Sequence, residues 1–286
     1  MTPSILGPSD LSSLLPPMQP DVHKGMRGSL VLYAGSYQGL GAALLAARAG
    51  SASGAGVVSL VLRDELWQAA ASNLVSQIVR RESDGPGRKA DAILAGPGWG
   101  KSEDRMQLLR SLLGSDVPLV LDADALFLAA AIGAQGRTAP LVLSPHPGEF
   151  VQLARCACKA SEDDVKRRML SDTLALGQQT ACSFGAVLVL KNSVTRVFHP
   201  DGRQAVWEGH VPELATGGSG DVLAGLLAGF MARGLSAWDA SCAAVIVHGM
   251  AGRIAARQLG FFQAQDIIPY AARIARSRND GSETGI

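Results

Sequence analysis

The chain has 286 residues, and its 26 Lys and Arg against 25 Asp and Glu give a formal net charge of +1. With 18% charged and 47% hydrophobic residues, the composition argues against a disordered chain, and the balanced charge argues against a dedicated nucleic-acid binder. The four cysteines form no CxxC pair and the five histidines no zinc-binding spacing, so we expect a globular protein of the reducing cytoplasm.

Neither end of the chain has the pattern of a targeting or membrane segment. Residues 1–20 have no basic segment ahead of an apolar one, and three prolines between residues 16 and 20 predict an irregular arm. Residues 277–286 are polar, so we expect a frayed tail. The apolar stretch 241–256 is interrupted by His248 and an arginine, which predicts a buried helix and no membrane partner.

Short apolar runs alternate with segments of helical periodicity along most of the chain. The runs that predict strands are residues 29–34, 57–62, 91–95, 118–122, 140–144 and 186–191, and the segments that predict helices are residues 41–51, 102–114, 125–133 and 161–180. Continuously apolar strands between helices are typical of a mostly parallel sheet with helices on both faces. The sequence therefore predicts a three-layer α/β/α fold in a single domain, residues 1–286.

The last third of the chain departs from this alternation. Residues 194–198 and 204–207 flank a turn and predict an antiparallel pair at one margin of the sheet. From residue 219 onward the pattern is purely helical. Because open α/β sheets bind ligands at the carboxyl ends of their strands, the loops that follow the strands form the candidate site.

Two glycine-rich loops follow strands in the first half of the chain. The loop at residues 35–41 has GxxxGxG spacing instead of the GxGxxG of dinucleotide-binding proteins, which leaves a tight turn and a ligand contact both open. The second loop ends in Gly100-Lys101-Ser102, as a P-loop does, but Ala95 stands at the first glycine position. A P-loop nucleotide hydrolase and a turn against a flat ligand are both compatible with this loop.

Strand ends in the middle of the chain carry acidic residues and a histidine. Asp122 and Asp124 follow one strand, and one of them is expected to cap the next helix. Asp122 is also a candidate to help to hold Mg²⁺ through water. His146 lies between two prolines, which fix the local backbone and leave a structural and a functional role open. Glu149 falls in the first turn of a helix, where a carboxylate is favoured.

The most distinctive segment is LATGGSGDVLAG at residues 214–225. The run Gly217-Gly218-Ser219-Gly220 precedes a helix that is expected to begin near Asp221, so its amides predict an anion site. A carboxylate there would repel a phosphate, and we expect Asp221 to be a base that takes a proton from an attacking hydroxyl. An acidic helix cap after a glycine turn is the alternative. Lys191, at a strand end, is the expected charge partner of the phosphate.

Together these motifs resemble those of the NAD(P)H-hydrate dehydratase family. The resemblance extends from about His23 to Gly252 and rests on HKGMRGSLVLYAGS, GLGAALLAARAG, DAILAGPGWG, PLVLDADAL, SPHPGEF and LATGGSGDVLAGLLAG. The GGSGD run alone would indicate only the wider ribokinase-like group, whereas HPGE with GPGxG and DADAL makes the narrower match. The resemblance implies a ribokinase-like fold with a mostly parallel central sheet.

The resemblance also implies a metabolite-repair enzyme. Members of the family dehydrate the S epimer of hydrated NADH or NADPH at the expense of a nucleotide, typically ADP in bacteria and ATP in eukaryotes. The implied co-factors and partners are Mg²⁺, ADP or ATP, and an NAD(P)H-hydrate epimerase. Many members carry that epimerase as a fused domain, so this chain is expected to be the stand-alone form. A cytoplasmic homo-oligomer, a tetramer as in the family, is expected.

The family's site residues can be carried over onto matching positions. The hydrate site would comprise Ala42, Gly98, His146 and Asp221, and the nucleotide would lie against Lys191, Asn192, Ser193, Val194, Thr195, Gly217, Gly218, Ser219 and Gly220. Asp221 would activate the ring hydroxyl, which attacks the terminal phosphate held by the GGSG amides, Lys191 and Mg²⁺. The ring nitrogen would then expel the phosphate.

Three positions depart from the usual family pattern. Phe127 stands where DADALN has its asparagine, Asn192 where a glycine follows the strand-end lysine, and His210 where GN has its asparagine. A second hypothesis on the same fold is a kinase for a small alcohol, which would use the GGSGD run in the same way. The P-loop hydrolase and a non-catalytic nucleotide-binding protein are the third and fourth.

Overall fold

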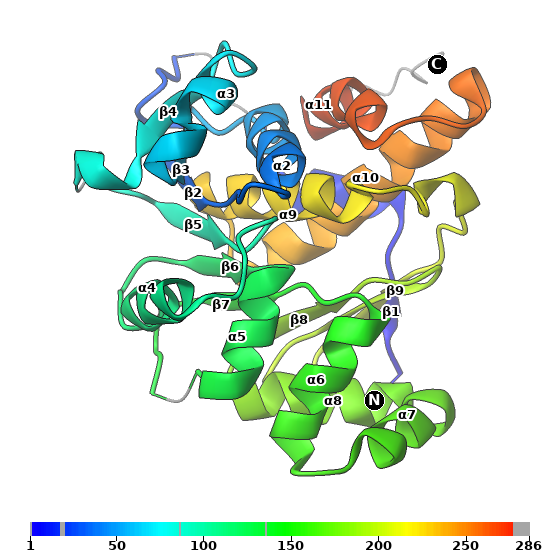
Figure 1. Cartoon of the computed structure of the whole chain (residues 1–286). Helices are drawn as coiled ribbons and strands as arrows, with labels where there is room; N and C mark the ends of the chain where they lie inside the picture. Colours follow the sequence, from blue (N-terminus) through cyan, green and yellow to red (C-terminus); the bar gives the residue numbers. More distant parts are fainter. Residues whose placement is uncertain (1, 18–20, 86, 135, 277–286) are drawn as a thin grey trace.

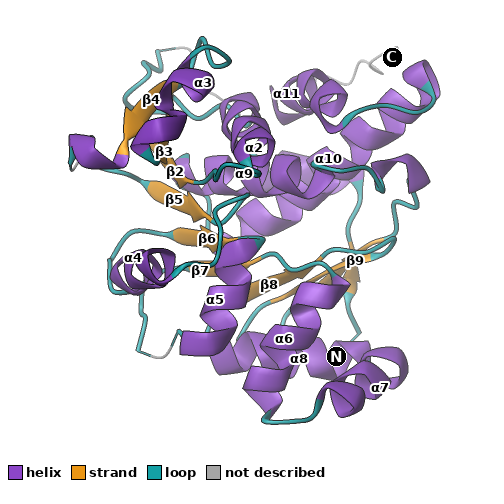
Figure 2. Ribbon diagram, viewed as in Figure 1, coloured by secondary structure: helices purple, strands orange, loops and turns teal. Residues whose placement is uncertain are grey.

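A computed structural model describes residues 2–17, 21–85, 87–134 and 136–276, and one sheet runs through its centre (Figures 1 and 2). The strands are β1 (Ser4–Ile5), β2 (Ser29–Tyr33), β3 (Val57–Leu62), β4 (Ile78–Arg81), β5 (Ala92–Ala95), β6 (Leu119–Leu121), β7 (Leu141–Leu143), β8 (Val187–Leu190), β9 (Thr195–Phe198) and β10 (Gln204–Trp207). Their order is β1-β10-β9-β8-β7-β6-β5-β2-β3-β4. β9 runs antiparallel to β8 and to β10, and every other pair is parallel.

Helices cover both faces of this sheet. The α-helices are α1 (Leu11–Leu14), α2 (Leu40–Ala52), α3 (Trp67–Ala71), α4 (Glu103–Leu113), α5 (Asp124–Ile132), α6 (Pro147–Cys158), α7 (Glu162–Ser171), α8 (Thr173–Phe184), α9 (Ser219–Ala232), α10 (Ala237–Leu259) and α11 (Ile268–Arg276). The 3₁₀ helices are η1 (Pro8–Asp10), η2 (Asp64–Leu66), η3 (Glu82–Asp84), η4 (Pro212–Leu214) and η5 (Ala264–Ile267). Figure 1 shows α2, α9, α10 and α11 on one face and α4, α5, α6 and α8 on the other. The predicted three-layer architecture is confirmed.

Each face of the sheet has its own hydrophobic core. Leu30 and Leu32 of β2 point into the core beneath α2, α9 and α10, whereas Val31 between them points into the core beneath α4, α5 and α6. This alternation follows from the period of two along a strand, and both faces are apolar because both are covered. α10 is buried from Ala240 to Gly249, which accounts for part of the low charge of the chain.

The N-terminal arm is more regular than its prolines predicted. β1 pairs in parallel with β10, the Leu6 N–H donates to the Val206 carbonyl at 2.8 Å, and η1 and α1 follow. Without β1, the outer edge of β10 would present unpaired backbone N–H and C=O groups. The expectation of an irregular arm over residues 1–20 is therefore corrected for residues 4–14. The expected frayed tail, residues 277–286, lies outside the described residues.

Two other sequence predictions need correction. The stretch 161–180 forms two helices instead of one, because α7 ends at Ser171 and the carboxylate of the next residue, Asp172, accepts a hydrogen bond from the Ala175 N–H at 3.2 Å to cap α8. β4 was not predicted, since its short, partly exposed sequence IVRR lacks a continuous apolar run. All the strands that were predicted are confirmed to within one residue at each end. The predicted antiparallel pair is β9 and β10, and β1 lies at the edge of the sheet beyond β10.

Small residues allow α2 and α9 to pack at close range. A Cβ added to Gly225 would lie 2.3 Å from the Ala46 carbonyl oxygen, and one added to Gly229 would lie 2.0 Å from Ser53 Oγ. The two helix backbones therefore approach as closely as only glycine permits. This contact holds the start of α9 at the carboxyl edge of the sheet.

Replacing Gly225 by alanine should destabilise the fold. We expect Gly225→Ala to lower the free energy of unfolding by about 1–3 kcal/mol, because the added methyl forces α2 and α9 apart. Urea denaturation measures the change. Gly114→Ala is the matched control, since its Cβ would meet only ordinary contacts at 3.5 and 3.6 Å. Equal stability of the two variants would contradict this view of the helix contact.

Candidate active site

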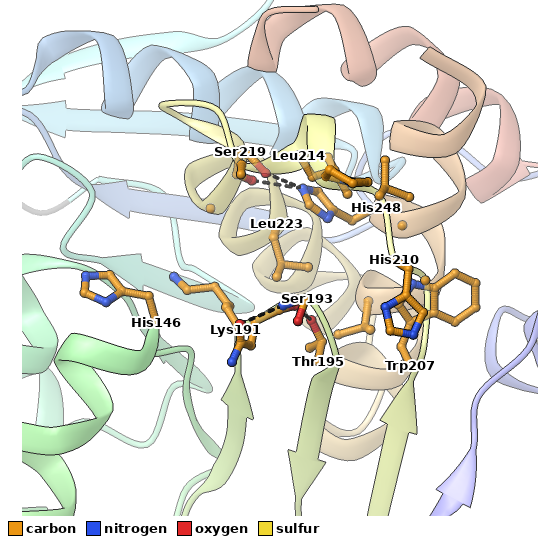
Figure 3. A pocket seen from close by; sticks show the side chains of 18 of the residues that line it. His146, Lys191, Ser193, Thr195, Trp207, His210, Leu214, Ser219, Leu223 and His248 are labelled. Atoms are coloured by element: carbon orange, nitrogen blue, oxygen red, sulfur yellow. Dashed lines mark hydrogen bonds between the residues drawn. The ribbon is translucent and has the colours of Figure 1, made fainter. Parts of the chain in front are cut away.

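A cavity of about 660 Å³ opens where β8 and β10 end, beside the start of α9 (Figure 3). Its lining residues are His146, Pro147, Lys191, Asn192, Ser193, Thr195, Trp207, Gly209, His210, Val211, Pro212, Leu214, Ala215, Thr216, Ser219, Gly220, Leu223, Val245, His248 and Gly249. Figure 3 shows Lys191 and the start of α9 towards one end, called the polar end below, and Trp207 of β10 towards the other, called the apolar end. The volume suits a ligand of nucleotide size.

The cavity brings together part of the predicted site. The predicted residues that line it are His146, Lys191, Asn192, Ser193, Thr195, Ser219 and Gly220. The predicted residues that do not line it are Ala42, Gly98, Val194, Gly217, Gly218 and Asp221, together with the candidate metal ligand Asp122. Several of the second group lie just beyond the polar end of the cavity, as the contacts below show.

The start of α9 presents backbone N–H groups to the polar end of the cavity. The helix begins at Ser219, two residues earlier than expected, and Gly218 before it has a φ of +91°. A Cβ at Gly218 would also lie 2.4 Å from Leu45 Cδ1, so this turn requires glycine. The amides of Gly220 and Asp221 fall in the first turn, where N–H groups have no partner within the helix. Together with the helix dipole they form an anion-binding surface.

Lys191 places a positive charge beside this turn. A Cβ on Gly220 would lie 3.3 Å from Lys191 Nζ, and the same Nζ lies 2.5 Å from Asp122 Oδ1. Asp122 is only 2% exposed, and its Oδ1 also accepts a hydrogen bond from Ser144 Oγ at 2.8 Å. The strand-end lysine is therefore held in place by a buried carboxylate and does not extend into solvent.

Three carboxylates, Asp122, Glu149 and Asp221, interact electrostatically with Lys191. The pKa of Asp221 is raised to about 7, first by burial and then by the negative charges of Asp122 and Glu149, while Lys191 opposes the rise. Burial also raises the pKa of Glu149, with Lys191 opposing the rise and Asp122 adding to it. A carboxylate with a pKa near 7 is poised to accept a proton at neutral pH.

His146 caps α6 at the wall of the cavity. Its side-chain Nδ1 accepts hydrogen bonds from the backbone N–H groups of Gly148 and Glu149 at 3.0 and 3.3 Å. The backbone N–H of His146 donates to Glu149 Oε2 at 2.8 Å. This is a capping box in which the imidazole replaces the usual hydroxyl. The side chain is still 58% exposed, so the cap leaves it accessible to a ligand.

The two glycine-rich loops meet outside the cavity. A Cβ on Gly39 would lie 2.3 Å from the carbonyl oxygen of Gly98, so the loops touch through their backbones. Ala42 lies half-buried in the first turn of α2, directly after this contact. Of the predicted hydrate-site residues, Gly98 thus lies on one of the touching loops and Ala42 lies in the helix that follows the other.

The GPGWGKS loop does not have the contacts expected of a P-loop. The Gly100 N–H donates to Asp124 Oδ2 at 2.8 Å, Lys101 Nζ lies 3.6 Å from Asp124 Oδ1, and that ammonium stacks 4.5 Å from the centre of the Phe127 ring. The lysine is therefore engaged at the surface. The expected cap is corrected as well: the N-cap of α5 is Ala123, with a φ of +49°, and Asp124 holds the neighbouring loop instead.

The other two departures from the family pattern lie at the cavity. Asn192 is exposed, and its Oδ1 accepts the N–H of Ser193 at 2.8 Å. His210 has a φ of +46°, the left-handed region in which asparagine and histidine are among the more frequent non-glycine residues. Between these two positions, β9 pairs antiparallel with both β8 and β10.

Sequence reasoning did not identify the apolar wall or His248. Trp207, Leu214, Leu223 and Val245 line the cavity from four different elements, and their spacing along the chain carries no signal. His248 Nε2 lies 3.0 Å from the Ser219 carbonyl oxygen and 3.2 Å from Ser219 Oγ. The only hint in the sequence was that this histidine interrupts an apolar helix.

No described helix is both long and apolar enough to cross a membrane. Within the same residues, no group of three or more His, Cys, Asp or Glu side chains is arranged to hold a metal ion.

Residues 30–273 match the sequence model of the family described as NAD(P)H-hydrate dehydratase. The chain is 34% identical over 272 residues to the ADP-dependent (S)-NAD(P)H-hydrate dehydratase of Xanthomonas campestris pv. campestris, an alignment that covers 87% of this chain and 89% of that protein. It also matches bifunctional NAD(P)H-hydrate repair enzymes Nnr, including that of Escherichia coli at 32% identity, and spans about half the length of these relatives.

Solved structures support the same assignment. The ADP/ATP-dependent NAD(P)H-hydrate dehydratase from Bacillus subtilis, co-crystallized with ATP/Mg²⁺, is 26% identical, with a TM-score of 0.84 and coverage of 96% of this chain and 98% of that one. A ribokinase-like superfamily protein from Enterococcus faecalis gives 26% identity, a TM-score of 0.83 and coverage of 96% and 97%. The expected ribokinase-like fold is confirmed, and the chain belongs to the NAD(P)H-hydrate dehydratase family.

Proposed function

We propose that this protein dehydrates the S epimer of hydrated NADH or NADPH, with ADP as the phosphate donor and AMP as a product. The observation that carries the proposal is Asp221, a carboxyl with a pKa of about 7 in the first turn of α9, next to Lys191. The Xanthomonas relative bears the name of this activity, and the similar Bacillus protein was co-crystallized with ATP/Mg²⁺.

The nucleotide is proposed to bind in the cavity with its phosphates at the polar end. The run from Gly217 to Gly220 and the ammonium of Lys191 would face the transferred phosphate, and residues 192–195 would line the path towards the nucleoside. Backbone amides and a fixed cation stabilise charge without reorganising, which is how such sites lower a barrier. The apolar end, with Trp207 and Leu214, would take the base.

The hydrate is proposed to bind on the other side of Asp221. Ala42, in the first turn of α2, and Gly98, on the loop that touches Gly39, would contact the hydrated ring. His146 would contact the ring through the part of its imidazole that remains exposed. The ring hydroxyl would then lie between Asp221 and the phosphate held at α9. This arrangement brings base, nucleophile and phosphate to one place.

The chemistry needs two steps. The ring hydroxyl oxygen attacks the terminal phosphorus of ADP, the bond from phosphorus to the bridging oxygen breaks, AMP leaves, and Asp221 accepts the hydroxyl proton. The ring nitrogen then donates its lone pair, the carbon–oxygen bond breaks and phosphate departs. Loss of a proton from the neighbouring ring carbon restores the double bond. The sum is removal of water from the hydrate and conversion of ADP to AMP and phosphate.

The charge of the site fits Mg²⁺. Asp122, Glu149 and Asp221 interact electrostatically with one cation, Lys191, so negative charge is in excess. Nucleotide-dependent enzymes hold Mg²⁺ with one or two carboxylates together with phosphates and water, and need no three-ligand protein cage. We propose that Asp122 and Glu149 face the ion, which supplies charge neutralisation to the phosphate when it is bound.

The setting of the activity is part of the proposal. An NAD(P)H-hydrate epimerase would convert the R epimer into the S epimer that this chain consumes. The chain would act as a single domain in the cytoplasm and as a homo-oligomer. Large exposed apolar side chains such as Tyr37, Val75 and Phe261, each at least 90% exposed, are the surface that such contacts would cover.

Absorbance at the reduced nicotinamide band tests the function directly. Mixed with hydrated NADH, Mg²⁺ and ADP, the protein should restore the band and release AMP in equal amount. Repeating the assay with ATP determines the choice of nucleotide. An alcohol kinase of the same fold would instead consume nucleotide only with its own alcohol, so no recovery with either nucleotide would exclude the dehydratase.

Asp221 should be required for turnover but not for nucleotide binding. We expect Asp221→Asn to lower kcat by about two to four orders of magnitude, the usual contribution of a positioned base. ADP affinity, measured by calorimetry, should be retained or increased, because a charge facing the phosphate is lost. Lys101→Ala is the control: it leaves both values unchanged here, whereas a P-loop enzyme would lose nucleotide binding.

The raised pKa of Asp221 should appear in the pH profile. The base must be ionised to accept a proton, so kcat/KM is expected to rise with pH through about 7. Because the pKa is raised on folding, the folded state binds more protons between the usual carboxyl range and pH 7, and stability should fall as pH rises across that interval. Asp221→Asn removes this dependence. A profile that is flat between pH 5 and 8 would contradict the assignment of Asp221 as the base.

A further inference from the structure

His248 is a buried imidazole that the proposed chemistry does not use. α10 carries it into the wall of the cavity, 9% exposed, between Val245 and Gly249 on the same helix face. Figure 3 shows it opposite Ser219, with Leu214 and Leu223 on either side. A polar ring in an otherwise apolar wall needs a reason, because burying it costs free energy unless its nitrogens are paired.

The contacts of His248 fix its tautomer. Nε2 lies 3.0 Å from the carbonyl oxygen of Ser219 and 3.2 Å from its Oγ. A carbonyl oxygen can only accept a hydrogen bond, so Nε2 carries the proton and donates it. Burial lowers the pKa of His248 to about 4, so the ring is neutral at pH 7. In a neutral imidazole with a protonated Nε2, Nδ1 is an acceptor.

That acceptor is left without a donor from the protein. The two ring nitrogens of imidazole diverge, so Nδ1 points away from Ser219 (Figure 3). Among the residues that the structure describes, none donates a hydrogen bond to Nδ1, and the atom is not one of the buried polar atoms that are sealed off without a partner. Nδ1 therefore remains open to the cavity.

The position of His248 along the cavity indicates what would reach it. Ser219, its partner, begins the helix turn at the polar end, and Figure 3 shows His248 between Ser219 and Trp207, which lies at the apolar end. His248 thus lies between the proposed sites of the phosphates and of the base. The groups of a nucleotide that can donate a hydrogen bond there are the ribose hydroxyls and the exocyclic amine of adenine.

We propose that His248 determines nucleotide specificity by accepting, at Nδ1, a hydrogen bond from the nucleoside half of the bound nucleotide. The inference rests on the proposed nucleotide-dependent function and adds a recognition residue to the same site. A nucleotide without the matching donor would leave Nδ1 buried and unpaired. It should bind about tenfold more weakly, the effect of losing one such hydrogen bond.

Calorimetry with nucleotide analogues identifies the donor. The full-length protein is titrated with ADP, with IDP, which lacks the exocyclic amine, and with 2′-deoxy-ADP and 3′-deoxy-ADP, which each lack one hydroxyl. One analogue is expected to bind about tenfold more weakly than ADP. Weaker binding of IDP would assign the contact to the base, and weaker binding of a deoxy analogue would assign it to the ribose. Equal affinity for all four would overturn the proposal.

Two variants separate recognition from packing. The amide nitrogen of glutamine can take the place of Nε2, so His248→Gln keeps a donor for Ser219 but loses the acceptor at Nδ1. The amide group of asparagine lies near the place of Nδ1, so His248→Asn keeps an acceptor there but loses the contact with Ser219. We expect His248→Gln to bind ADP and the discriminated analogue equally, and His248→Asn to retain part of the discrimination.

A purely structural role would give a different result. If His248 only stabilised the start of α9, its replacement would weaken the binding of every nucleotide by the same factor. The ratio of analogue to ADP affinity would then keep its wild-type value in both variants, and this result would overturn the proposal. The two proposals also fail separately. If the wild-type protein binds no ADP, both proposals are overturned. If it converts hydrated NADH to NADH but the ratio of analogue to ADP affinity is the same in the wild-type protein and in both variants, only the role of His248 is overturned.

Discussion

Lys191 and Asp122 meet at 2.5 Å beside the first turn of α9, and the charges of the site are arranged around this contact. Asp122 is almost fully buried, and a buried carboxylate without a partner would be strongly destabilising. The pair therefore fixes the ammonium at the end of β8, next to Gly220. Burial, together with the charges of Asp122 and Glu149, raises the pKa of Asp221 into the range that a general base needs, against the opposing charge of Lys191.

Ala123, which directly follows Asp122, has a strained backbone and links the contact of Asp122 with Lys191 to the loops at the carboxyl ends of the neighbouring strands. Ala123 has a φ of +49°, a costly conformation for a residue with a side chain. The chain can hold it because the Asp122 carbonyl packs against Gly96, where a Cβ would lie only 1.8 Å away. The turn sends neighbouring carboxylates in different directions: Asp122 to Lys191, and Asp124 to the amide of Gly100. The phosphate half and the loop half of the site thus depend on a single turn.

Features encoded by a few consecutive residues were predicted from the sequence, whereas features that depend on contacts between distant residues were missed. Continuous apolar runs located the central strands, and the GGSGD run located the glycine turn at the start of α9, because each is encoded within a few consecutive residues. The pairing of Lys191 with Asp122 joins residues 69 positions apart, so no local pattern reveals it. β1 forms only because β10 offers an open edge. His248 was missed because α10 is buried on most sides, and periodicity cannot tell which buried residue faces a cavity.

If the proposed function is correct, the residues that would bind and transfer the phosphate are those that an alcohol kinase of the same fold would also need. The difference must then come from the substrate, because only a ring nitrogen with a lone pair next to the phosphorylated carbon can expel the phosphate. The protein has to admit such a ring, and the contact of Gly39 with Gly98 suits this purpose. Two backbones that touch without side chains offer a flat surface of amides and carbonyls. The excess of glycine, 33 residues, is thus partly explained by this contact, since a Cβ on Gly39 or Gly98 would collide with the backbone of the other loop.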